Sequence, residues 1–337
     1  MGAQEGRGLA VVTGGSSGIG RELAKLFAAD GYDLLIAARS ERIEAVADGM
    51  RAAGSSVQAC RTDLSTPEGV EALQAAILAA GRPVEAIAIN AGVGLGGPFT
   101  ENRWEDERDL MRINVVETVH LAKCVVPGMV ARGSGRVLFT ASISGTTPVP
   151  FEAVYGASKA FVLSFAQALR NEVRDTGVTV TALLPGQTET DFFHRAGMDD
   201  TRIGAGPKSD PAEVARAGYE AMMAGREKVV AGSAATRFEA AVLNRVLPDA
   251  AKAERHRTMS EPGGAAVARG ARRADRTAPS ASRPPGERPP RRPARSFARS
   301  LCRPREFQHR ISLSRRSMPE RHRSIQRLTW TCIIMQP

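Results

Sequence analysis

The sequence has few cysteines, no long apolar run and no lysine after Glu261. Its four cysteines, at positions 60, 124, 302 and 332, show neither a C-x-x-C spacing nor clustering with other metal ligands, which excludes a cysteine-based metal site and fits a reducing compartment. No apolar stretch reaches the roughly 18 residues of a membrane span, and the first residues lack a signal-peptide core. We therefore expect a cytoplasmic protein with no metal and no membrane partner.

The positive charge of the chain is confined to its C-terminal part. The whole sequence has 46 basic and 36 acidic residues, a formal net charge of +10. Residues 262–337 contain 18 arginines and four acidic residues, a net charge of +14, so residues 1–261 carry −4. The N-terminal part therefore has the mildly acidic balance of an ordinary soluble domain.

Residues 262–337 are rich in arginine, proline and serine, show no apolar period, and are expected to form a disordered tail. Three interpretations compete: a segment that contacts nucleic acid or anionic lipid, an extension without a role, and a frame-shifted or read-through end. The aromatic residues Phe297, Phe307 and Trp330 are scattered rather than interleaved with the arginines. This favours the last two interpretations, and we expect no nucleic-acid partner.

A glycine-rich segment follows the first apolar run of the chain. Residues 9–12 are typical of a strand buried on both faces, and they lead through Thr13–Gly20 into a helical pattern. Gly14 permits a tight turn, Gly18 permits close approach of a pyrophosphate, and Gly20 permits close packing of helix on sheet. The helix N-terminus offers free N–H groups and a positive dipole end to phosphates. The segment therefore predicts a dinucleotide-binding loop.

Tyr155 and Lys159 are four residues apart in a predicted helix and so share one face. A neighbouring ammonium favours the phenolate and is expected to lower the pKa of the tyrosine, making it a general acid and base. Ser142 could hold a carbonyl oxygen against the phenol; Ser144 is an alternative that the spacing from Tyr155 disfavours. The pair is common as a structural feature, and gains weight from the glycine-rich segment.

Apolar runs alternate with amphipathic stretches, which predicts an α/β fold: a doubly wound, Rossmann-type parallel sheet of about seven strands with helices on both faces. Expected strands are 9–13, 33–38, 56–61, 85–89, 135–141, 178–184 and 227–231, and expected helices lie near 18–30, 40–53, 67–80, 103–131, 152–175 and 210–225. Residues 1–261 form one domain, in which about 187–225 is a mobile, partly apolar substrate lid, and 262–337 form the tail.

With these motifs in order, the chain resembles the short-chain dehydrogenase/reductase family over roughly residues 7–255. The spacing Thr13-Gly14-x-x-x-Gly18-Ile19-Gly20 has the form that this family uses. Further landmarks are Asp63-Leu64, Asn90-Ala91-Gly92, Asn114, Ser142, Tyr155, Lys159, Pro185-Gly186 and Thr190.

The resemblance implies a nicotinamide cofactor and its contacts. Asp63 and Leu64 would hold the adenine, Asn90 to Gly92 would line the adenosine and ribose, and Thr190, with Thr188 as a weaker candidate, would bind the carboxamide. Asn90 could also serve as a turn-former at its strand end. The expected cofactor-binding residues are Gly14, Ser16, Ser17, Gly18, Ile19, Gly20, Arg39, Asp63, Leu64, Asn90, Ala91, Gly92, Tyr155, Lys159, Pro185, Gly186, Thr188 and Thr190.

The end of the second strand bears on cofactor choice. An acid there binds the ribose 2′-hydroxyl of NAD, but here Ala38 takes that place and Arg39 follows. An arginine can pair with a 2′-phosphate, with Ser40 as a helper, so NADP(H) is preferred and NAD(H) is possible. Ser17 stands where enzymes of the family with strong NADP preference can carry a basic residue.

The resemblance implies interconversion of a carbonyl and a secondary alcohol (CH–OH/C=O). The carbonyl would bind between Ser142 and Tyr155, Tyr155 would transfer the proton, and Lys159 would bind the nicotinamide ribose. Asn114 would support a water relay, or be a satisfied core amide. A 3-oxoacyl group or other hydrophobic ketone is a candidate substrate, and a sugar or steroid stays open. The alternative is a non-catalytic NADP-binding sensor or assembly protein; a homodimer or homotetramer is expected by analogy.

Overall fold

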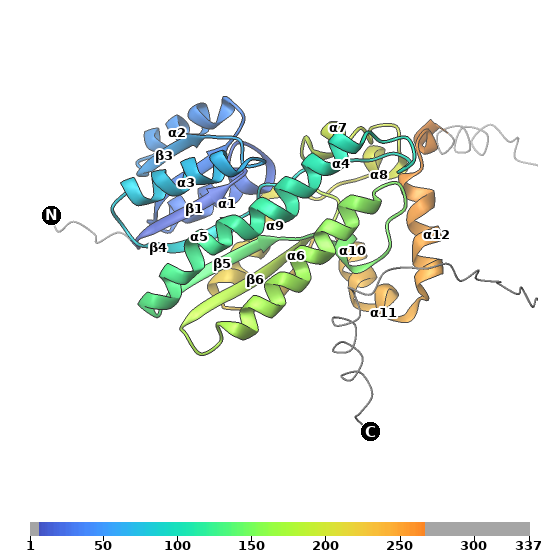
Figure 1. Ribbon diagram of the computed structural model, residues 1–337. Coiled ribbons are helices and arrows are strands. Elements are labelled where there is room, and N and C mark those ends of the chain that lie inside the picture. Colours follow the sequence, from blue (N-terminus) through green and yellow to red (C-terminus); the bar gives the residue numbers. More distant parts are fainter. Residues whose placement is uncertain (1–6, 267–337) are drawn as a thin grey trace, which may run out of the picture. The chain divides into compact units, whose positions relative to one another are not determined.

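A computed structural model describes residues 7–266, and the chain forms one seven-stranded sheet over this range (Figure 1). The strands lie in the order β3-β2-β1-β4-β5-β6-β7, and all neighbours are parallel. Their bounds are β1 Leu9–Thr13, β2 Asp33–Ala38, β3 Val57–Arg61, β4 Val84–Ile89, β5 Gly135–Thr140, β6 Val178–Pro185 and β7 Lys228–Ala231. The predicted sheet is confirmed, with each strand boundary within one residue of its expected position.

Helices cover both faces of this sheet. On one face α3 (Pro67–Ala79), α5 (Glu117–Arg132) and α6 (Ala153–Glu172) pack over the central strands. On the other face lie α1 (Gly18–Ala29), α2 (Arg42–Ala52) and α9 (Pro211–Met223). The remaining helical segments are α4 Trp104–Met111, the π-helical η1 Arg112–Val116, η2 Ile143–Thr146, α7 Phe192–Arg195, α8 Arg202–Ala205, α10 Ala234–Phe238, η3 Glu239–Leu243, α11 Asn244–Val246 and α12 Asp249–Ser260.

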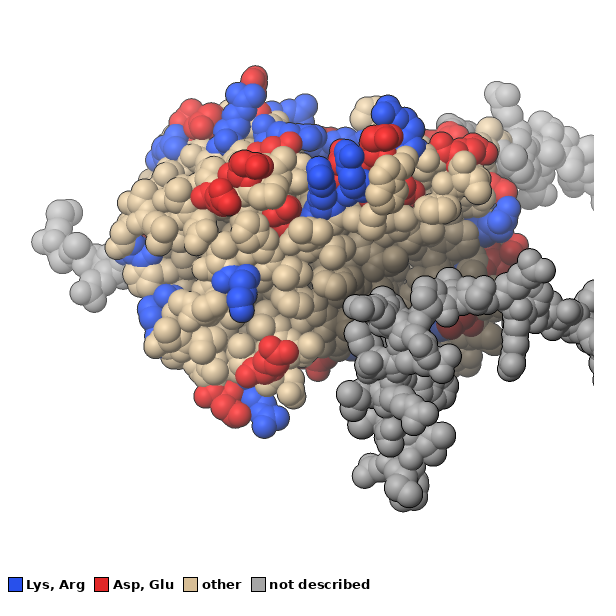
Figure 2. Space-filling view, in the orientation of Figure 1, with Lys and Arg blue, Asp and Glu red and all other residues tan. Residues whose placement is uncertain are grey.

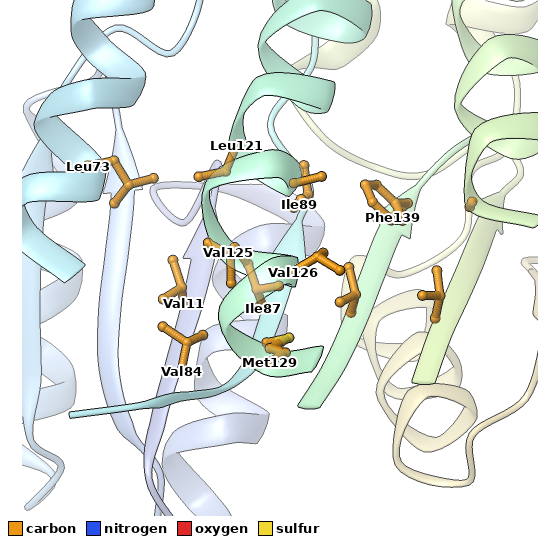
Figure 3. Packing of buried hydrophobic residues seen from close by; sticks show 14 of the residues in the cluster. Val11, Leu73, Val84, Ile87, Ile89, Leu121, Val125, Val126, Met129 and Phe139 are labelled. Carbon is orange, nitrogen blue, oxygen red and sulfur yellow. The ribbon is translucent and has the colours of Figure 1, made fainter. Parts of the chain in front are cut away.

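The strands read as unbroken apolar runs because each one is buried on both faces. In β1, Val11 belongs to the core under α3 and α5, whereas Ala10 and Val12 belong to the core under α1 and α9. Figure 3 shows the first of these cores, with Leu121 and Val125 of α5 directed at the strands.

The helical stretch Trp104–Arg132 is long and apolar enough to cross a membrane, with a mean hydropathy of 1.3 over its most apolar window. A core helix of a globular protein meets the same criterion, and 44% of that window is buried inside the protein. In Figure 3, Val126 and Met129 of α5 lie among the core residues of the sheet. The stretch is therefore weak evidence for a membrane span.

The C-terminal third differs from the predicted organisation. Within the predicted lid 187–225, α9 packs on α1 and on the sheet, so the part beside the cavity is residues 187–210. The segments α10 to α12, which follow β7, were not predicted. Since α12 buries only the polar side chains of His256 and Ser260, it has no apolar period to detect. The predicted disordered tail lies outside the described residues from position 267 onward.

Candidate active site

A cavity of about 770 Å³ opens at the carboxyl ends of the strands. It brings together the predicted cofactor loop, the predicted strand-end residues and the Ser142, Tyr155 and Lys159 side chains. Of the residues expected from sequence to act in binding or catalysis, only Gly20 and Asn114 do not line it. In doubly wound sheets this edge is where ligands bind, so the residues meet where the fold predicts.

The glycine loop between β1 and α1 fits a pyrophosphate. A Cβ at Gly20 would overlap the Gly14 carbonyl oxygen, and a Cβ at Gly18, whose φ is +53°, would lie 2.7 Å from Thr190 Cγ2. Ser17 stands at the N-cap of α1 without a side-chain capping bond, so the first-turn N–H groups stay free to bind an anion. The glycine turn therefore lets a pyrophosphate approach the uncapped N-terminus of α1, as dinucleotide binding requires.

Asn90 joins the ends of three strands. Its Nδ2 donates to the Thr13 carbonyl oxygen at 3.1 Å, and its Oδ1 accepts from Thr140 Oγ1 at 3.0 Å. Thr13 Oγ1 in turn accepts from the backbone N–H groups of Asn90 and Ala91, both at 2.9 Å. The structure thus shows the strand-end role proposed for Asn90, and adds Thr13 and Thr140, whose side chains the sequence did not single out.

Arg39 and Asp63 face each other at the adenosine end of the cavity, with Arg39 Nη1 3.5 Å from Asp63 Oδ2. Asp63 Oδ1 also accepts from the backbone N–H and the hydroxyl of Ser65 at 3.0 and 2.7 Å. Partial burial acts to raise the pKa of the Asp63 carboxyl, but the Ser65 hydrogen bonds and the Arg39 charge outweigh it and lower that pKa. Arg39 is 77% exposed and remains accessible to a second anion.

Tyr155 and Ser142 are both buried, each with 7% of its surface exposed. Burial raises the pKa of the Tyr155 phenol well above its ordinary value, the nearby Glu152 carboxylate raises it further, and hydrogen bonding with Ser142 acts in the opposite direction. The expectation of a lowered tyrosine pKa is therefore wrong, because loss of solvation outweighs the hydrogen bond with Ser142, which acts to lower the pKa. Tyr155 is held as the neutral phenol, a proton donor.

The Lys159 ammonium lies over the face of the Tyr155 ring. Its Nζ is 5.9 Å from the ring centre and donates to the Thr140 carbonyl oxygen at 3.0 Å. Burial lowers the pKa of Lys159 to about 8. An ammonium has three N–H donors, so two are left for hydroxyl groups of a ligand.

Asn114 sits in the π-helical turn η1, a local widening often found at functional sites. Its Nδ2 donates to the Val93 carbonyl oxygen and to Ser158 Oγ, and its Oδ1 accepts from the Val93 N–H, all within 2.9 to 3.0 Å. Both amide hydrogens are thus used to hold the chain after β4 against α6. The interpretation of Asn114 as a satisfied core amide is supported, and its water relay stays a prediction.

The segment after β6 closes the other side of the cavity. Thr190 Oγ1 accepts from the Phe192 N–H at 3.2 Å, and Thr188 Oγ1 donates to the Gly186 carbonyl oxygen at 3.0 Å. The Phe192 ring lies 5.3 Å from the Tyr155 ring, centre to centre, and also packs against Phe193. The cavity is therefore apolar next to the Tyr155 phenol.

The cavity residues that the sequence did not single out include Glu152, immediately before α6, and His256 and Met259 of α12. Glu152 and His256 contact each other across 104 residues of sequence. Neither lies in a recognisable local pattern, so the sequence offered no signal for them. No group of three potential metal-ligating side chains is found within residues 7–266.

Comparisons with known proteins agree with this geometry. A family profile described as short chain dehydrogenase matches residues 8–200. The dehydrogenase/reductase SDR family member 7B of Rattus norvegicus is 32% identical over 203 residues, which are 58% of this chain and 62% of that protein. The 3-oxoacyl-(acyl-carrier-protein) reductase FabG of Vibrio cholerae is 33% identical over 216 residues, which are 62% of this chain and 87% of that protein.

Two solved structures share the fold. A short-chain dehydrogenase from Sphingobium yanoikuyae in complex with NADPH is 27% identical, with a TM-score of 0.62, and covers 83% of this chain and 99% of its own. A short-chain dehydrogenase/reductase from Burkholderia phymatum in complex with NAD is 26% identical, with a TM-score of 0.64, and covers 73% and 94%. Both nicotinamide cofactors thus occur among similar structures.

Proposed function

The chain belongs to the short-chain dehydrogenase/reductase family, and we propose that it is an NADP(H)-dependent enzyme that interconverts a ketone and a secondary alcohol. The observation that carries the proposal is the buried Tyr155 phenol beside Ser142 and Lys159, in the same cavity as the glycine loop. An intact proton donor of this kind argues against a non-catalytic cofactor sensor.

Ser142, Tyr155 and Lys159 each have a separate role in the proposed reaction. A bound nicotinamide cofactor supplies or accepts the hydride. Ser142 holds the substrate oxygen beside Tyr155, and the Tyr155 phenol gives its proton to that oxygen as negative charge develops there. Lys159, anchored on Thr140, offers its remaining N–H groups to cofactor ribose hydroxyls and can resupply the proton.

The protonation state of Tyr155 suits it to act as the acid in carbonyl reduction. A general acid must carry its proton when the reaction begins, and the raised pKa of Tyr155 keeps the phenol protonated at neutral pH. Oxidation would need the phenolate, which forms in this environment only at high pH or when a ligand brings positive charge.

The NADP(H) preference rests on Arg39, which lies on the cavity wall after β2 and is largely exposed. No acid occupies the strand end, where Ala38 stands. A 2′-phosphate would meet the Arg39 guanidinium, and NAD(H), which lacks that phosphate, would bind less tightly.

The proposed substrate class rests on the apolar side chains beside Tyr155. Phe192, Phe193, Ile203 and Met259 line the cavity, which suits the apolar body of a ketone. The relative from Vibrio cholerae is named as a 3-oxoacyl carrier-protein reductase. We therefore propose a hydrophobic ketone, with a 3-oxoacyl group as one candidate.

A cytoplasmic homodimer or homotetramer completes the proposal. Figure 2 shows that the band over α5 and α6 on this face is mostly free of charged side chains. Two apolar side chains, Val116 before α5 and Phe161 on α6, are 55% and 42% exposed. A second copy of the chain that packed on this band would cover them.

The test is a panel of ketones and secondary alcohols incubated with NADPH or NADP+, followed by absorbance of the reduced cofactor. We expect turnover of apolar ketones by the native chain and a loss of about 100- to 10,000-fold in kcat for Tyr155→Phe. Cofactor affinity, measured separately, should be retained in Tyr155→Phe. Turnover that survives this substitution undiminished would contradict the proposal.

A further inference from the structure

A buried polar cluster lies at the substrate end of the cavity, outside the Ser142, Tyr155 and Lys159 group. Glu152 stands at the N-cap of α6, three residues before Tyr155, and only 3% of its surface is exposed. His256 Nε2 lies 3.0 Å from Glu152 Oε2, and Ser260 Oγ donates to the same oxygen at 3.2 Å. His256 Nε2 and Ser260 Oγ are 2.9 Å apart. We call Glu152, His256 and Ser260 the α12 cluster.

Within residues 7–266, only one of the two Glu152 carboxylate oxygens takes part in hydrogen bonds. Both contacts reach Oε2, and no residue in the described part of the chain hydrogen-bonds to Oε1. Among the residues that the structure describes, the sealed polar side-chain atoms without a partner are Thr147 Oγ1 and Thr179 Oγ1. Glu152 Oε1 is not one of them, and Glu152 lines the cavity.

The same reasoning applies to His256. Its Nε2 is committed to the α12 cluster, and no hydrogen bond to Nδ1 is found within residues 7–266. His256 lines the cavity too, and its Nδ1 is likewise absent from the sealed, unpartnered atoms of that range. Within residues 7–266, Glu152 Oε1 and His256 Nδ1 therefore have no hydrogen-bond partner, and both residues line the cavity.

A largely buried carboxylate is costly unless hydrogen bonds satisfy it. The cavity that Glu152 lines is also lined by the apolar side chains of Phe192, Ile203 and Met259 and by the charged side chains of Arg195 and Glu239. A ligand that extends from Tyr155 would meet the Glu152 carboxylate at one spot of this wall. A hydrogen-bond donor at that spot would satisfy Oε1, whereas an apolar group would leave it buried without a partner.

We propose that Glu152 and His256 form a recognition site for a hydrogen-bond donor, a hydroxyl or ammonium group, that the substrate carries away from its reacting carbonyl. The proposal rests on the proposed ketone reduction and narrows its substrate class. Glu152 precedes Tyr155 by three residues at the start of one helix, so the two side chains emerge within about one helical turn of each other.

A purely structural role is the competing explanation. The α12 cluster fixes α12 to the start of α6, and Arg257 adds a contact 5.1 Å above the Phe151 ring. Phe151 has a positive φ of 64°, so this turn is held in a conformation that side chains rarely adopt. This attachment of α12 to α6, which we call the latch, needs Glu152 Oε2 and not Oε1. The difference separates the structural role from ligand recognition experimentally.

The experiment compares three probes: acetophenone, its para-hydroxy derivative and its para-methoxy derivative. The last two place an oxygen at the same position, but only the hydroxyl donates a hydrogen bond. Their affinities for the full chain, saturated with oxidised cofactor so that no ketone is reduced, are measured by calorimetry. We expect the hydroxy probe to bind at least about tenfold more tightly than the methoxy probe. In Glu152→Gln the ratio of these two affinities should fall to about three or less.

The ratio isolates the donor contact, because any change in the field at Tyr155 acts on the carbonyl of all probes alike. Glu152→Asp, which keeps the charge but withdraws it by one methylene, serves as a second variant and should also lower the ratio. Ser260→Ala removes a latch contact while leaving Glu152 Oε1 in place, and should keep the ratio high. Thr258→Ala, exposed on α12, is the matched control for substitution on that helix.

A ratio near one in the native chain would overturn the proposal. So would an equal loss in Ser260→Ala and Glu152→Gln, which would assign the α12 cluster to the latch alone. Failure of the proposed function has a different signature, since it would appear as absence of NADPH oxidation with any of the probes whatever the binding ratio.

Discussion

The Lys159 ammonium donates to the Thr140 carbonyl oxygen at 3.0 Å and lies 5.9 Å from the centre of the Tyr155 ring. Both side chains are buried, and burial favours the neutral form of each: it raises the pKa of Tyr155 and lowers that of Lys159 to about 8. The pair is thus a phenol ready to give a proton and an amine close to its own titration point at neutral pH.

Lys159→Met is expected to stabilise the cofactor-free protein near pH 7 while abolishing activity. The folded pKa of about 8 lies below the ordinary value of 10.5, so between these values the unfolded chain binds more protons and stability rises with pH. Below pH 8 the full free-energy cost of burying the charged Lys159 is present, on the order of 3 kcal/mol. Lys159→Met should therefore raise the free energy of unfolding, measured with denaturant, by less at about pH 9.5 than at pH 7. A gain that is constant with pH would rule out this cause.

Gly20→Ala and Gly49→Ala form a matched pair. A Cβ at Gly20 would overlap the Gly14 carbonyl oxygen, whereas a Cβ at Gly49, exposed in α2, would meet nothing within 4 Å. Gly20→Ala should cost about 1–3 kcal/mol of stability and weaken cofactor binding. Gly49→Ala should stabilise by roughly 0.5–1 kcal/mol and leave cofactor binding unchanged. Thermal melts measure the stability of the two variants and cofactor titrations measure their affinity. Equal cofactor affinities in Gly20→Ala and Gly49→Ala would contradict the role of the glycine loop in cofactor binding.

Arg39→Asp should reverse the cofactor preference. Loss of a charge-assisted contact and gain of a repelling carboxylate are expected to change the NADPH-to-NADH ratio of kcat/KM by about ten- to a hundredfold or more. Arg174→Asp makes the same change of net charge on an exposed surface outside the cavity and is the control. An unaltered ratio in Arg39→Asp would refute the assignment of Arg39 to the 2′-phosphate.

Truncation should distinguish the two ends of the C-terminal segment. The N–H of Gly263 donates to Asp200 Oδ2 at 2.8 Å and the N–H of Ala265 to the Asp200 carbonyl oxygen at 2.9 Å, next to α8. Ending the chain after Ala266 is expected to leave melting temperature and KM unchanged. Ending it after Glu261 removes both contacts and should raise KM. A loss of activity on the first truncation would give the tail an enzymatic role.

The sheet could be predicted because each strand, such as Leu9–Thr13, is buried on both faces and therefore reads as an apolar run. The cofactor loop could be predicted because its glycines are demanded by local geometry. By contrast α12 docks through His256 and Ser260, polar residues that carry no periodic signal. Its partner Glu152 lies 104 residues away from His256, a pairing that only the folded chain reveals.

The pKa of Tyr155 was predicted to shift in the wrong direction. A sequence shows that Lys159 follows Tyr155 by one helical turn, but not how far water is excluded from both. The expected lowering considered the neighbouring charge alone, and burial reversed its sign. Asn114 illustrates the same limit, since its three hydrogen bonds depend on the π-helical turn around it and on Val93 and Ser158.

The central claim is that hydride passes from the cofactor to a ketone carbon while Tyr155 protonates the oxygen. The most direct measurement is reduction of an apolar ketone with NADPH deuterated at the transferring position, followed by mass spectrometry of the alcohol. The account predicts deuterium on the carbinol carbon with the native chain and almost none, for lack of product, with Tyr155→Phe. Alcohol formed without deuterium from either deuterated face of the cofactor, or formed equally well by Tyr155→Phe, would contradict it.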